Sequence, residues 1–256
     1  MQAPDELREV VETSLAELEL DGSLGALTEP MRYALAGGGK RIRPVLCLAV
    51  CEAAGGRVED ALRAATALEL VHTFSLVHDD LPALDDDDER RGRPSLHVAF
   101  GEAVALLAGD ALLTEAFGLA ARCERPEIAR ELARATLGMI GGQHLDVTGA
   151  DVPLDALHRL KTGRLLAAAV GLGLWSAGVP EPQQEPWRTF GEELGVLFQA
   201  IDDVLDGDGY AAELGADGAR RLALDTAGRA RERLQGLDAD TTVLEELVDG
   251  LAVRTV

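Results

Sequence analysis

The chain has 256 residues, of which 47% are apolar and only 4% aromatic, and this composition rules out a disordered chain. Acidic residues outnumber basic residues by 45 to 24, which gives a formal net charge of −21. A field of that sign repels the phosphate backbone of nucleic acids and anionic membrane surfaces. We therefore expect no nucleic-acid partner.

The spacing of the apolar residues indicates helices throughout the chain. Apolar side chains recur every three or four positions, whereas no stretch of strict alternation is long enough for a sheet. We predict an all-α fold with a single domain over residues 1–256, because no shift in composition marks a boundary. In chain order, the predicted helices are 5–20, 27–36, 42–54, 59–80, 101–122, 126–142, 153–176, 184–206, 216–235 and 240–252.

No segment of the sequence reads as an export signal or a membrane span. The N-terminal segment is acidic and amphipathic, without the basic and apolar regions of a secretory signal. The most apolar stretch, Leu165–Ala177, is shorter than the roughly 20 residues that cross a bilayer. The three cysteines form no CxxC pair, which favours reduced packing residues. We predict a cytoplasmic protein without a membrane span.

The first of two aspartate clusters ends the fourth predicted helix. Asp79 and Asp80 follow an apolar run, Pro82 stops the helix, and Asp85 adds a third carboxylate. The acidic run continues to Asp88, and its last members fit a solvated loop. The first three aspartates are the ones we expect to bind a ligand.

The second cluster lies at the end of the predicted helix 184–206. Asp202 and Asp206 share one helical face with Asp203 beside them, among residues that are otherwise apolar. Like charges at this spacing destabilise a buried helix unless cations neutralise them. Carboxylates without cysteine or paired histidine ligands suit Mg²⁺ or Mn²⁺, and Mg²⁺ binds one or two carboxylates together with substrate phosphate oxygens. The two clusters therefore predict a metal site for a phosphate-bearing substrate.

Basic residues accompany the predicted metal site. The segment GGGKRIRP places Lys40, Arg41 and Arg43 directly after three glycines, and Arg90 and Arg91 follow the first aspartate cluster. Arginine binds phosphate as a two-pronged donor and lysine as a point charge. The glycines match neither the Walker A spacing nor the dinucleotide-binding motif, which disfavours a nucleotide-hydrolysing P-loop. We predict a metal–diphosphate site.

Five segments carry a resemblance to one protein family. They are GGGKRIRP (37–44), ELVHTFSLVHDDLPALDDDDERRGRPSLHVAFGE (69–102), GGQHLDV (141–147), HRLKTG (158–163) and FQAIDDVLD (198–206). Together they resemble the trans-type isoprenyl diphosphate synthases, also called the polyprenyl synthetase family, and in particular its short-chain farnesyl and geranylgeranyl members. The segments stand in family order and span most of the chain.

The resemblance implies an isoprenoid-synthase-type helical bundle in which the two aspartate clusters face each other across a central cavity, with a homodimer as the usual assembly. It implies head-to-tail transfer of an allylic prenyl group to isopentenyl diphosphate, with release of inorganic diphosphate. It also implies Mg²⁺ as the cofactor, as three ions when diphosphate is bound, and Mn²⁺ as an ion that can replace it.

The roles of individual residues are implied by their matches to the family motifs. The implied metal ligands are Asp79, Asp80, Asp85, Asp202, Asp203 and Asp206. The residues implied to hold isopentenyl diphosphate are Lys40, Arg43, His72 and Arg91, and those around the allylic diphosphate are Arg90, Lys161, Thr162 and Gln199. The residues implied to be most directly catalytic are Asp79, Asp85, Lys161 and Asp202.

Product length in this family depends on the residues about one helical turn before the first aspartate motif. Phe74 and Ser75 hold those positions in this chain. A bulky ring at position 74, together with the expanded spacing DDLPALD, resembles farnesyl-forming members. We therefore expect a C15 product, with a C20 geranylgeranyl product as the alternative.

The segment after the second cluster departs from the family pattern. The family has a loop there with a Gly-Lys-Asp element and a further lysine, whereas only Gly-Asp-Gly separates Asp206 from Tyr210. Without that lysine we expect a slow enzyme with a raised Mg²⁺ requirement and some hydrolysis of the allylic substrate, unless Arg220, Arg221 or a partner chain supplies the charge.

Other hypotheses fit parts of the sequence. A catalytically impaired regulatory subunit of a heteromeric prenyl synthase would keep the fold, although both aspartate motifs are intact here. Terpene cyclases and head-to-head prenyl synthases lack the GGGKR element, which serves a second diphosphate substrate. A Ca²⁺-binding protein would need a DxDxDG loop, which this sequence lacks.

Overall fold

A computed structural model describes residues 1–253, and helices form nearly all of it. The all-α prediction is confirmed, because the only strands within residues 1–253 are β1 (Glu89–Arg90) and β2 (Arg93–Pro94), a short antiparallel pair. The α-helices are α1 (Pro4–Ala16), α2 (Thr28–Leu35), α3 (Ile42–Ala53), α4 (Val58–Asp79), α5 (Leu96–Phe100), α6 (Glu102–Ala121), α7 (Pro126–Val147), α8 (Leu154–His158), α9 (Arg164–Ser176), α10 (Glu185–Asp206), α11 (Gly209–Leu214), α12 (Ala216–Gln235) and α13 (Thr242–Ala252). Single turns of 3₁₀-helix cover Gly22–Leu27 and Glu181–Gln183.

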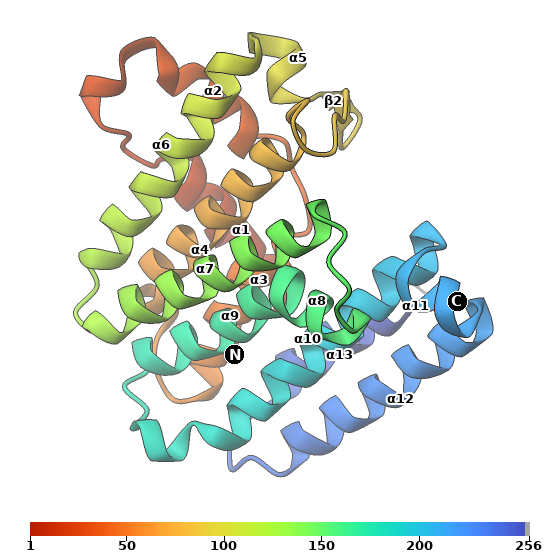
Figure 1. Cartoon of the computed structure of the whole chain (residues 1–256). Coiled ribbons are helices and arrows are strands. Elements are labelled where there is room, and N and C mark those ends of the chain that lie inside the picture. The colour runs from red at the N-terminus through yellow and green to blue at the C-terminus, as the bar shows by residue number, and fades with distance from the viewer. Residues whose placement is uncertain (254–256) are drawn as a thin grey trace.

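Helix α4 lies at the centre of the bundle and ends at the first aspartate cluster (Figure 1). It packs against α3, α6 and α9. Its residues are buried on several sides, and Ala64, Ala65 and Leu68 have no exposed surface. A helix that is apolar around most of its circumference is typical of a bundle core. Helix α4 therefore runs through the core and places Asp79 and Asp80 at its C-terminal end.

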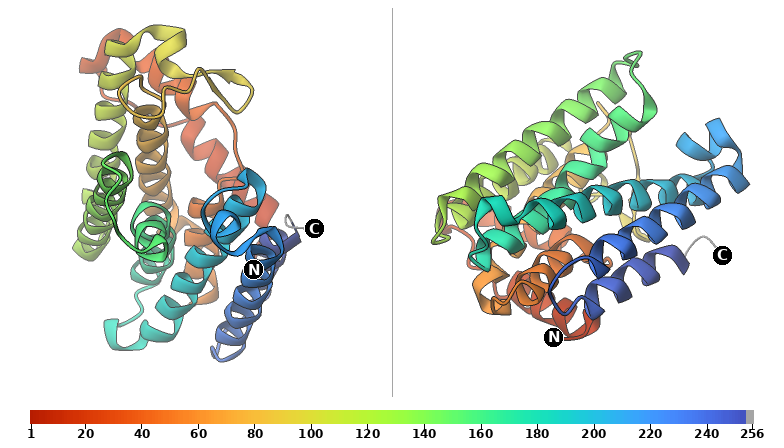
Figure 2. Two further views of the ribbon diagram at one scale, coloured as in Figure 1. Left: turned by 45° about the vertical axis from the view of Figure 1, so that its right-hand side comes forward. Right: turned by 90° about the horizontal axis from the view of Figure 1, so that it is seen from below.

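Helix α10 carries the second cluster and lies beside α12, with α13 next to α12 at the edge of the bundle (Figure 2). The buried face of α12 consists of small residues at intervals of three or four, namely Ala219, Ala223, Ala227 and Ala230. Small side chains at this spacing let two helices approach closely. One hydrophobic cluster joins side chains from α1, such as Leu7, with side chains from α13, such as Leu244.

The structure corrects several predicted helix boundaries. Helix α1 ends at Ala16 rather than at residue 20, and α7 continues through the GGQHLDV segment to Val147. The predicted helix 153–176 is divided into α8, a π-helical turn over Arg159–Gly163, and α9. The short helices α5 and α11 were not predicted, because four- to six-residue segments carry too little periodicity to identify.

Helix α6, rather than Leu165–Ala177, is the helix within residues 1–253 that is long and apolar enough to cross a membrane by length and composition. It packs against α4, α5 and α7, and 39% of the residues in its apolar window are buried. Core helices of bundles meet the same criteria of length and composition, so this feature is weak evidence for a membrane span.

Candidate active site

The two aspartate clusters meet at one cavity of about 750 Å³. Asp79 reaches it from the end of α4 and Asp202 from the last turn but one of α10. The predicted site residues that line this cavity are Arg43, His72, Phe74, Ser75, Asp79, Arg91, Lys161, Thr162 and Asp202. The rest of its wall is largely apolar and includes Leu113, Met139, Ile140, Val147 and Leu165. The cavity therefore combines charged groups from both clusters with apolar side chains that can contact a hydrocarbon chain.

The three aspartates of the first cluster have different surroundings. Asp79 is half-buried, and burial raises the pKa of its carboxyl to about 6, with Lys161 acting in the opposite direction. Asp80 is only 3% exposed and accepts a hydrogen bond from Arg90 Nε at 2.9 Å. Burial raises the pKa of Asp80, and the ion pair with Arg90 limits the rise. Asp85 is exposed, and its backbone N–H donates to the Asp79 carbonyl at 2.9 Å.

The second cluster repeats this arrangement. Asp202 is half-buried and faces the cavity, Asp203 is 2% exposed, and Asp206 is exposed. Both carboxylate oxygens of Asp203 accept hydrogen bonds, one from Gln199 Nε2 at 2.6 Å and one from the Tyr210 backbone N–H at 2.7 Å. In both clusters, therefore, the first aspartate faces the cavity and the second is held by the protein.

The short link after α10 packs directly against the second cluster. Gly207 ends α10 with φ of 78°, and the Tyr210 ring lies edge-on to His158 with their centroids 5.0 Å apart. A side chain at Gly209 would collide with the Asp203 carboxylate. Because Gly209 has no side chain, the backbone can pass close to Asp203. Only Gly207 and Asp208 therefore separate α10 from α11.

Lys161 and Thr162 enter the cavity from the π-helical turn between α8 and α9. Two glycines on neighbouring helices give this turn its room. A Cβ atom at Gly142 of α7 would lie 2.5 Å from the Lys161 backbone nitrogen, and one at Gly195 of α10 would lie 3.1 Å from the Gly163 Cα. Turns of π-helix inside α-helices are frequent at functional sites, because the extra residue redirects side chains.

Lys161 is held by a partner from α7. Its Nζ atom lies 2.5 Å from Asp146 Oδ2, so the GGQHLDV segment provides the carboxylate that orients the lysine. Gln143, from the same segment, lines the cavity, and both polar atoms of its amide are buried without a hydrogen-bond partner. A buried unpaired amide inside a cavity is ready to bind a polar group of a ligand.

A second pocket, of about 500 Å³, lies at the GGGKRIRP segment and shares Arg43, His72 and Arg91 with the first. Lys40 is exposed at this pocket. Burial, reinforced by the neighbouring arginines, holds the pKa of His72 well below its usual value, so the imidazole is neutral. Arg43 Nη1 lies 3.3 Å from His72 Nε2, and burial lowers the Arg43 pKa. The pocket is suited to an anion.

Other predicted site residues lie outside the main cavity in this conformation. Arg90 pairs with Asp80 and, at 3.1 Å, with Asp87, rather than pointing into the cavity. Gln199 is bound to Asp203. The predicted sources of replacement charge on α12 do not line the cavity: Arg220 and Arg221 are exposed, and Arg220 pairs with Asp217 at 3.3 Å.

The donor set fits a metal ion that shares its ligands with a substrate. Within residues 1–253, no three histidine, cysteine, aspartate or glutamate side chains already converge as a ligand set. The cavity instead offers single carboxylates from two sides, Asp79 and Asp202. Mg²⁺ keeps water and substrate oxygens among its ligands and needs only one or two carboxylates, so these residues fit it.

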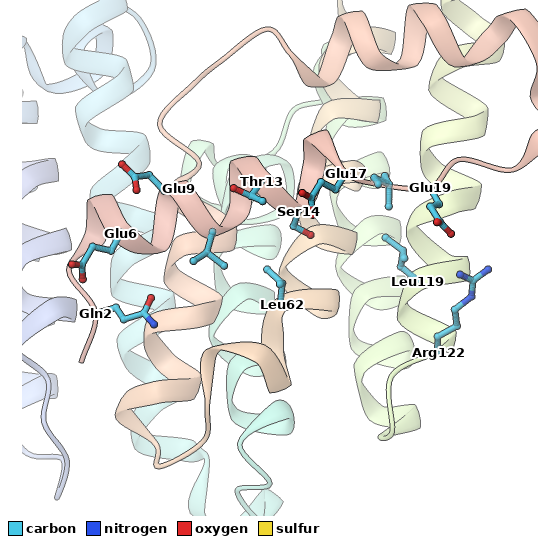
Figure 3. A pocket seen from close by; sticks show the side chains of 12 residues that line it. Gln2, Glu6, Glu9, Thr13, Ser14, Glu17, Glu19, Leu62, Leu119 and Arg122 are labelled. Atoms are coloured by element: carbon cyan, nitrogen blue, oxygen red, sulfur yellow. The ribbon is translucent and has the colours of Figure 1, made fainter.

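A further groove runs along α1 and has a different character (Figure 3). Its labelled side chains include Glu6, Glu9, Glu17 and Glu19, whereas Arg122 is the basic residue on its wall. None of the motif residues lines this groove. An acidic wall disfavours a diphosphate, which leaves the cavity between the aspartate clusters as the candidate active site.

Comparisons with known proteins agree with the geometry. The family model of the polyprenyl synthetases matches residues 25–219. The farnesyl diphosphate synthase of Escherichia coli is 42% identical over 266 residues, covering 89% of this chain and 89% of the relative. The geranylgeranyl diphosphate synthase of Cyanophora paradoxa is 44% identical over 216 residues, covering 78% of this chain and 72% of the relative. A geranyltranstransferase crystal structure from Thermotoga maritima superimposes with a TM-score of 0.85 at 30% identity, covering 98% of each chain.

The resemblance found in the sequence motifs is confirmed by these matches, which cover most of the chain. They also agree on the class of reaction, the elongation of prenyl diphosphates, which in this family requires a divalent metal ion. The chain therefore belongs to the polyprenyl synthetase family, as a short-chain prenyltransferase.

Proposed function

We propose that this enzyme makes farnesyl diphosphate, by adding isopentenyl diphosphate to dimethylallyl and then geranyl diphosphate, with Mg²⁺ as the cofactor. The single observation that carries the proposal is one cavity lined by Asp79 and Asp202 together with Phe74 and other apolar side chains. Relatives of both product classes match the chain, so the choice of C15 over C20 rests on the side chains of the cavity wall.

The chain's own residues account for the proposed chemistry. Breaking the allylic carbon–oxygen bond leaves an allylic cation and a diphosphate anion, and preorganised positive charge lowers the cost of forming the anion. Lys161, fixed by Asp146, lies where it can bind that anion. Apolar groups such as Met139 and Leu165 exclude water from the cation. The isopentenyl double bond attacks the cation to form the new carbon–carbon bond, and the resulting cation loses a proton to the released diphosphate.

We propose that four of the six predicted aspartates would hold Mg²⁺, as three ions when diphosphate is bound. Asp79 and Asp202 lead this set because they face the cavity, and the exposed Asp85 and Asp206 can turn toward it. The remaining two, Asp80 and Asp203, would act mainly by holding Arg90 and Gln199 in place. Bound metal would supply the positive charge that neutralises the leaving diphosphate.

Product length is the first test of this proposal. Phe74 is 7% exposed, lines the cavity and packs edge-on to His78 with ring centroids 4.7 Å apart. Ser75 lines the same cavity. Phe74→Ala should deepen the cavity and shift the product from C15 to C20 or longer, whereas Ser75→Phe should shorten it. Chromatography of the dephosphorylated products measures both, and a C20 product from the wild type would overturn the C15 assignment.

We further propose a homodimer formed through α6 and α7. Large apolar side chains on these two contacting helices are exposed, with Leu107 55% and Leu137 70% accessible, and exposed apolar surface is typical of interfaces. Leu106 of α6 is 45% accessible as well. Leu137→Glu should convert a dimer into monomers in light-scattering measurements. A wild-type chain that is monomeric at micromolar concentration would contradict this part of the proposal.

The remaining assignments follow from the same observations. The helices outside residues 25–219 share the hydrophobic cluster of the rest, which supports a single domain over the whole chain. A cytoplasmic location is proposed because farnesyl diphosphate synthases of two bacteria match the chain, although plant relatives that match it are named as chloroplastic. No comparison favours the regulatory-subunit hypothesis, and the effect of the shortened link on rate stays a prediction.

A further inference from the structure

The pocket at residues 37–44 contains a buried ion pair that has no place among the proposed substrate contacts. Arg41 is 4% exposed, and its Nη1 atom donates to Glu69 Oε1 at 2.7 Å. Its Nε atom donates to Glu12 Oε1 of α1 at 2.8 Å, and its Nη2 atom donates to the Leu35 carbonyl at 2.5 Å. Every nitrogen of the guanidinium group therefore has a partner inside the protein, so Arg41 is not a free donor for a diphosphate.

Glu69 is the one acidic side chain among the residues that line this pocket. The basic residues that line it are Lys40, Arg41, Arg43 and Arg91. Glu69 is 2% exposed, and burial raises its pKa while the surrounding arginines oppose the rise. Arginines gathered in a buried place repel one another unless a countercharge is present. Glu69 supplies that countercharge before any substrate binds.

The backbone of Arg41 is also unusual. It has φ of 47° and ψ of 35°, in the left-handed region, and it stands immediately before the first residue of α3. A residue other than glycine stays in this region only when its surroundings hold it there. The inward-pointing Arg41 side chain provides that restraint. With Arg41 turned inward, Lys40 is exposed at the pocket and Arg43, the second residue of α3, lines its wall.

We propose that the Arg41–Glu69 ion pair is a positioning device for the homoallylic diphosphate, setting the spacing of Lys40 and Arg43 before isopentenyl diphosphate arrives. Glu12 of α1 also pairs with Arg41, from the more exposed side of the guanidinium group. The inference rests on the assignment of this pocket to isopentenyl diphosphate, which the family resemblance implies for Lys40, Arg43, His72 and Arg91 and which we take as part of the proposed function. Arg41 and Glu69 are positioning residues, because they act through the two basic side chains and not on the substrate.

A double substitution separates positioning from stability. Glu69→Leu alone leaves Arg41 Nη1 without its buried acceptor and removes the buried countercharge of the pocket, so it should lower the melting temperature. The pair Arg41→Met with Glu69→Leu replaces the ion pair by apolar groups, and such replacements often restore stability. We expect the double variant to recover its melting temperature but to keep a KM for isopentenyl diphosphate raised by about ten- to a hundredfold. Its KM for geranyl diphosphate should stay near the wild-type value. A wild-type KM for isopentenyl diphosphate in the double variant would overturn the proposal.

A gentler variant covers the case in which the double variant fails to fold. Arg41→Lys keeps the buried positive charge but cannot bridge Glu12, Glu69 and Leu35 together. It should raise the KM for isopentenyl diphosphate selectively, with the KM for geranyl diphosphate unchanged. Equal changes in both constants, or none, would contradict a positioning role.

Two controls distinguish failure of this inference from failure of the pocket assignment. Glu131→Gln weakens another partly buried ion pair, to Arg188 at 2.7 and 2.8 Å, which lies outside both pockets of the site. It should lower the melting temperature and leave the KM for isopentenyl diphosphate unchanged. Lys40→Ala tests the assignment itself. If Lys40→Ala leaves that KM unchanged, the pocket assignment and the inference both fall, whereas a raised KM there with a wild-type value in the double variant removes only the inference.

Discussion

The two aspartate clusters use the same order of exposure but different means of holding their middle residue. Asp79 and Asp202 face the cavity, whereas Asp80 and Asp203 are buried. Asp80 is held by a charged group, Arg90, which is the last residue of β1. Asp203 is held by neutral donors from α10 and from the start of α11.

The first and the middle aspartate of each motif therefore have different roles. A half-buried carboxylate that faces the cavity carries an unfavourable charge that a metal ion can relieve. A carboxylate that already accepts strong hydrogen bonds fixes local structure instead. Asp80 can change its contacts when the Arg90 side chain moves, whereas Asp203 accepts a hydrogen bond from the backbone N–H of Tyr210. The two clusters should therefore respond differently to matching substitutions.

The largest effect is expected at the residues that face the cavity. Asp79→Asn and Asp202→Asn each remove a charged ligand from a site whose catalysis is mainly electrostatic, so turnover should fall by about 10³-fold or more. The fold should survive in both. Asp86→Asn, in the exposed loop after the first cluster, is the matched control and should retain normal turnover. Steady-state assays at saturating Mg²⁺ measure the comparison, and near-normal turnover in either of the first two variants would contradict it.

The helices and both aspartate motifs could be predicted because apolar periodicity and the glycine and proline residues at helix ends specify them. The pairs Asp80–Arg90, Asp146–Lys161 and Glu69–Arg41 could not, because each joins side chains from separate segments whose relative placement depends on packing. The π-helical turn was also missed, since its residues keep a helical pattern. The glycines of α7 and α10 that make room for it carry no signal of their own without the fold.

The next effect is on stability at the middle aspartates. Asp203→Ala leaves the Tyr210 N–H and the Gln199 amide without their acceptor, and each buried unsatisfied group costs about 1–3 kcal/mol. Asp80→Ala should cost less, because the side chain of Arg90 is 35% exposed and can find water. Urea unfolding compares the two variants. The exposed Asp206→Ala should change the free energy of unfolding by less than about 0.5 kcal/mol. A larger loss of unfolding free energy in Asp80→Ala than in Asp203→Ala would contradict this prediction.

A glycine pair on α7 tests whether the π-helical turn keeps Lys161 between the clusters. Gly142→Ala forces a methyl group against the Lys161 backbone and should cost about 1–3 kcal/mol of stability together with activity. A Cβ atom added at the adjacent Gly141 would have no other atom within 4 Å. Gly141→Ala should therefore stabilise α7 by up to about 1 kcal/mol. Thermal unfolding and activity assays measure both, and equal outcomes at the two glycines would show that the turn is not constrained.

The last expected effect is the pH dependence of stability in the absence of metal. Because burial raises the Asp79 pKa from 3.8 to about 6, the folded protein binds a proton there that the unfolded chain does not. This contribution to stability is present at pH 3.5 and is lost as pH rises through 6, at about 1.4 kcal/mol per pH unit within that window. Asp79→Asn removes the cost of ionisation. Its melting temperature should therefore match the wild type near pH 3.5 and exceed it at pH 7, whereas a difference that does not change with pH would contradict the assignment of the raised pKa.

The most direct test of the account is prenyl transfer itself. The purified protein is incubated with isopentenyl diphosphate and geranyl diphosphate, with and without Mg²⁺, and the products are separated by chain length. We predict farnesyl diphosphate from the wild-type protein only when Mg²⁺ is present, and none from the folded Asp79→Asn variant. Elongation that persists in that variant, or a folded wild-type protein that elongates no allylic substrate, would contradict the claim that the two aspartate clusters form the active site.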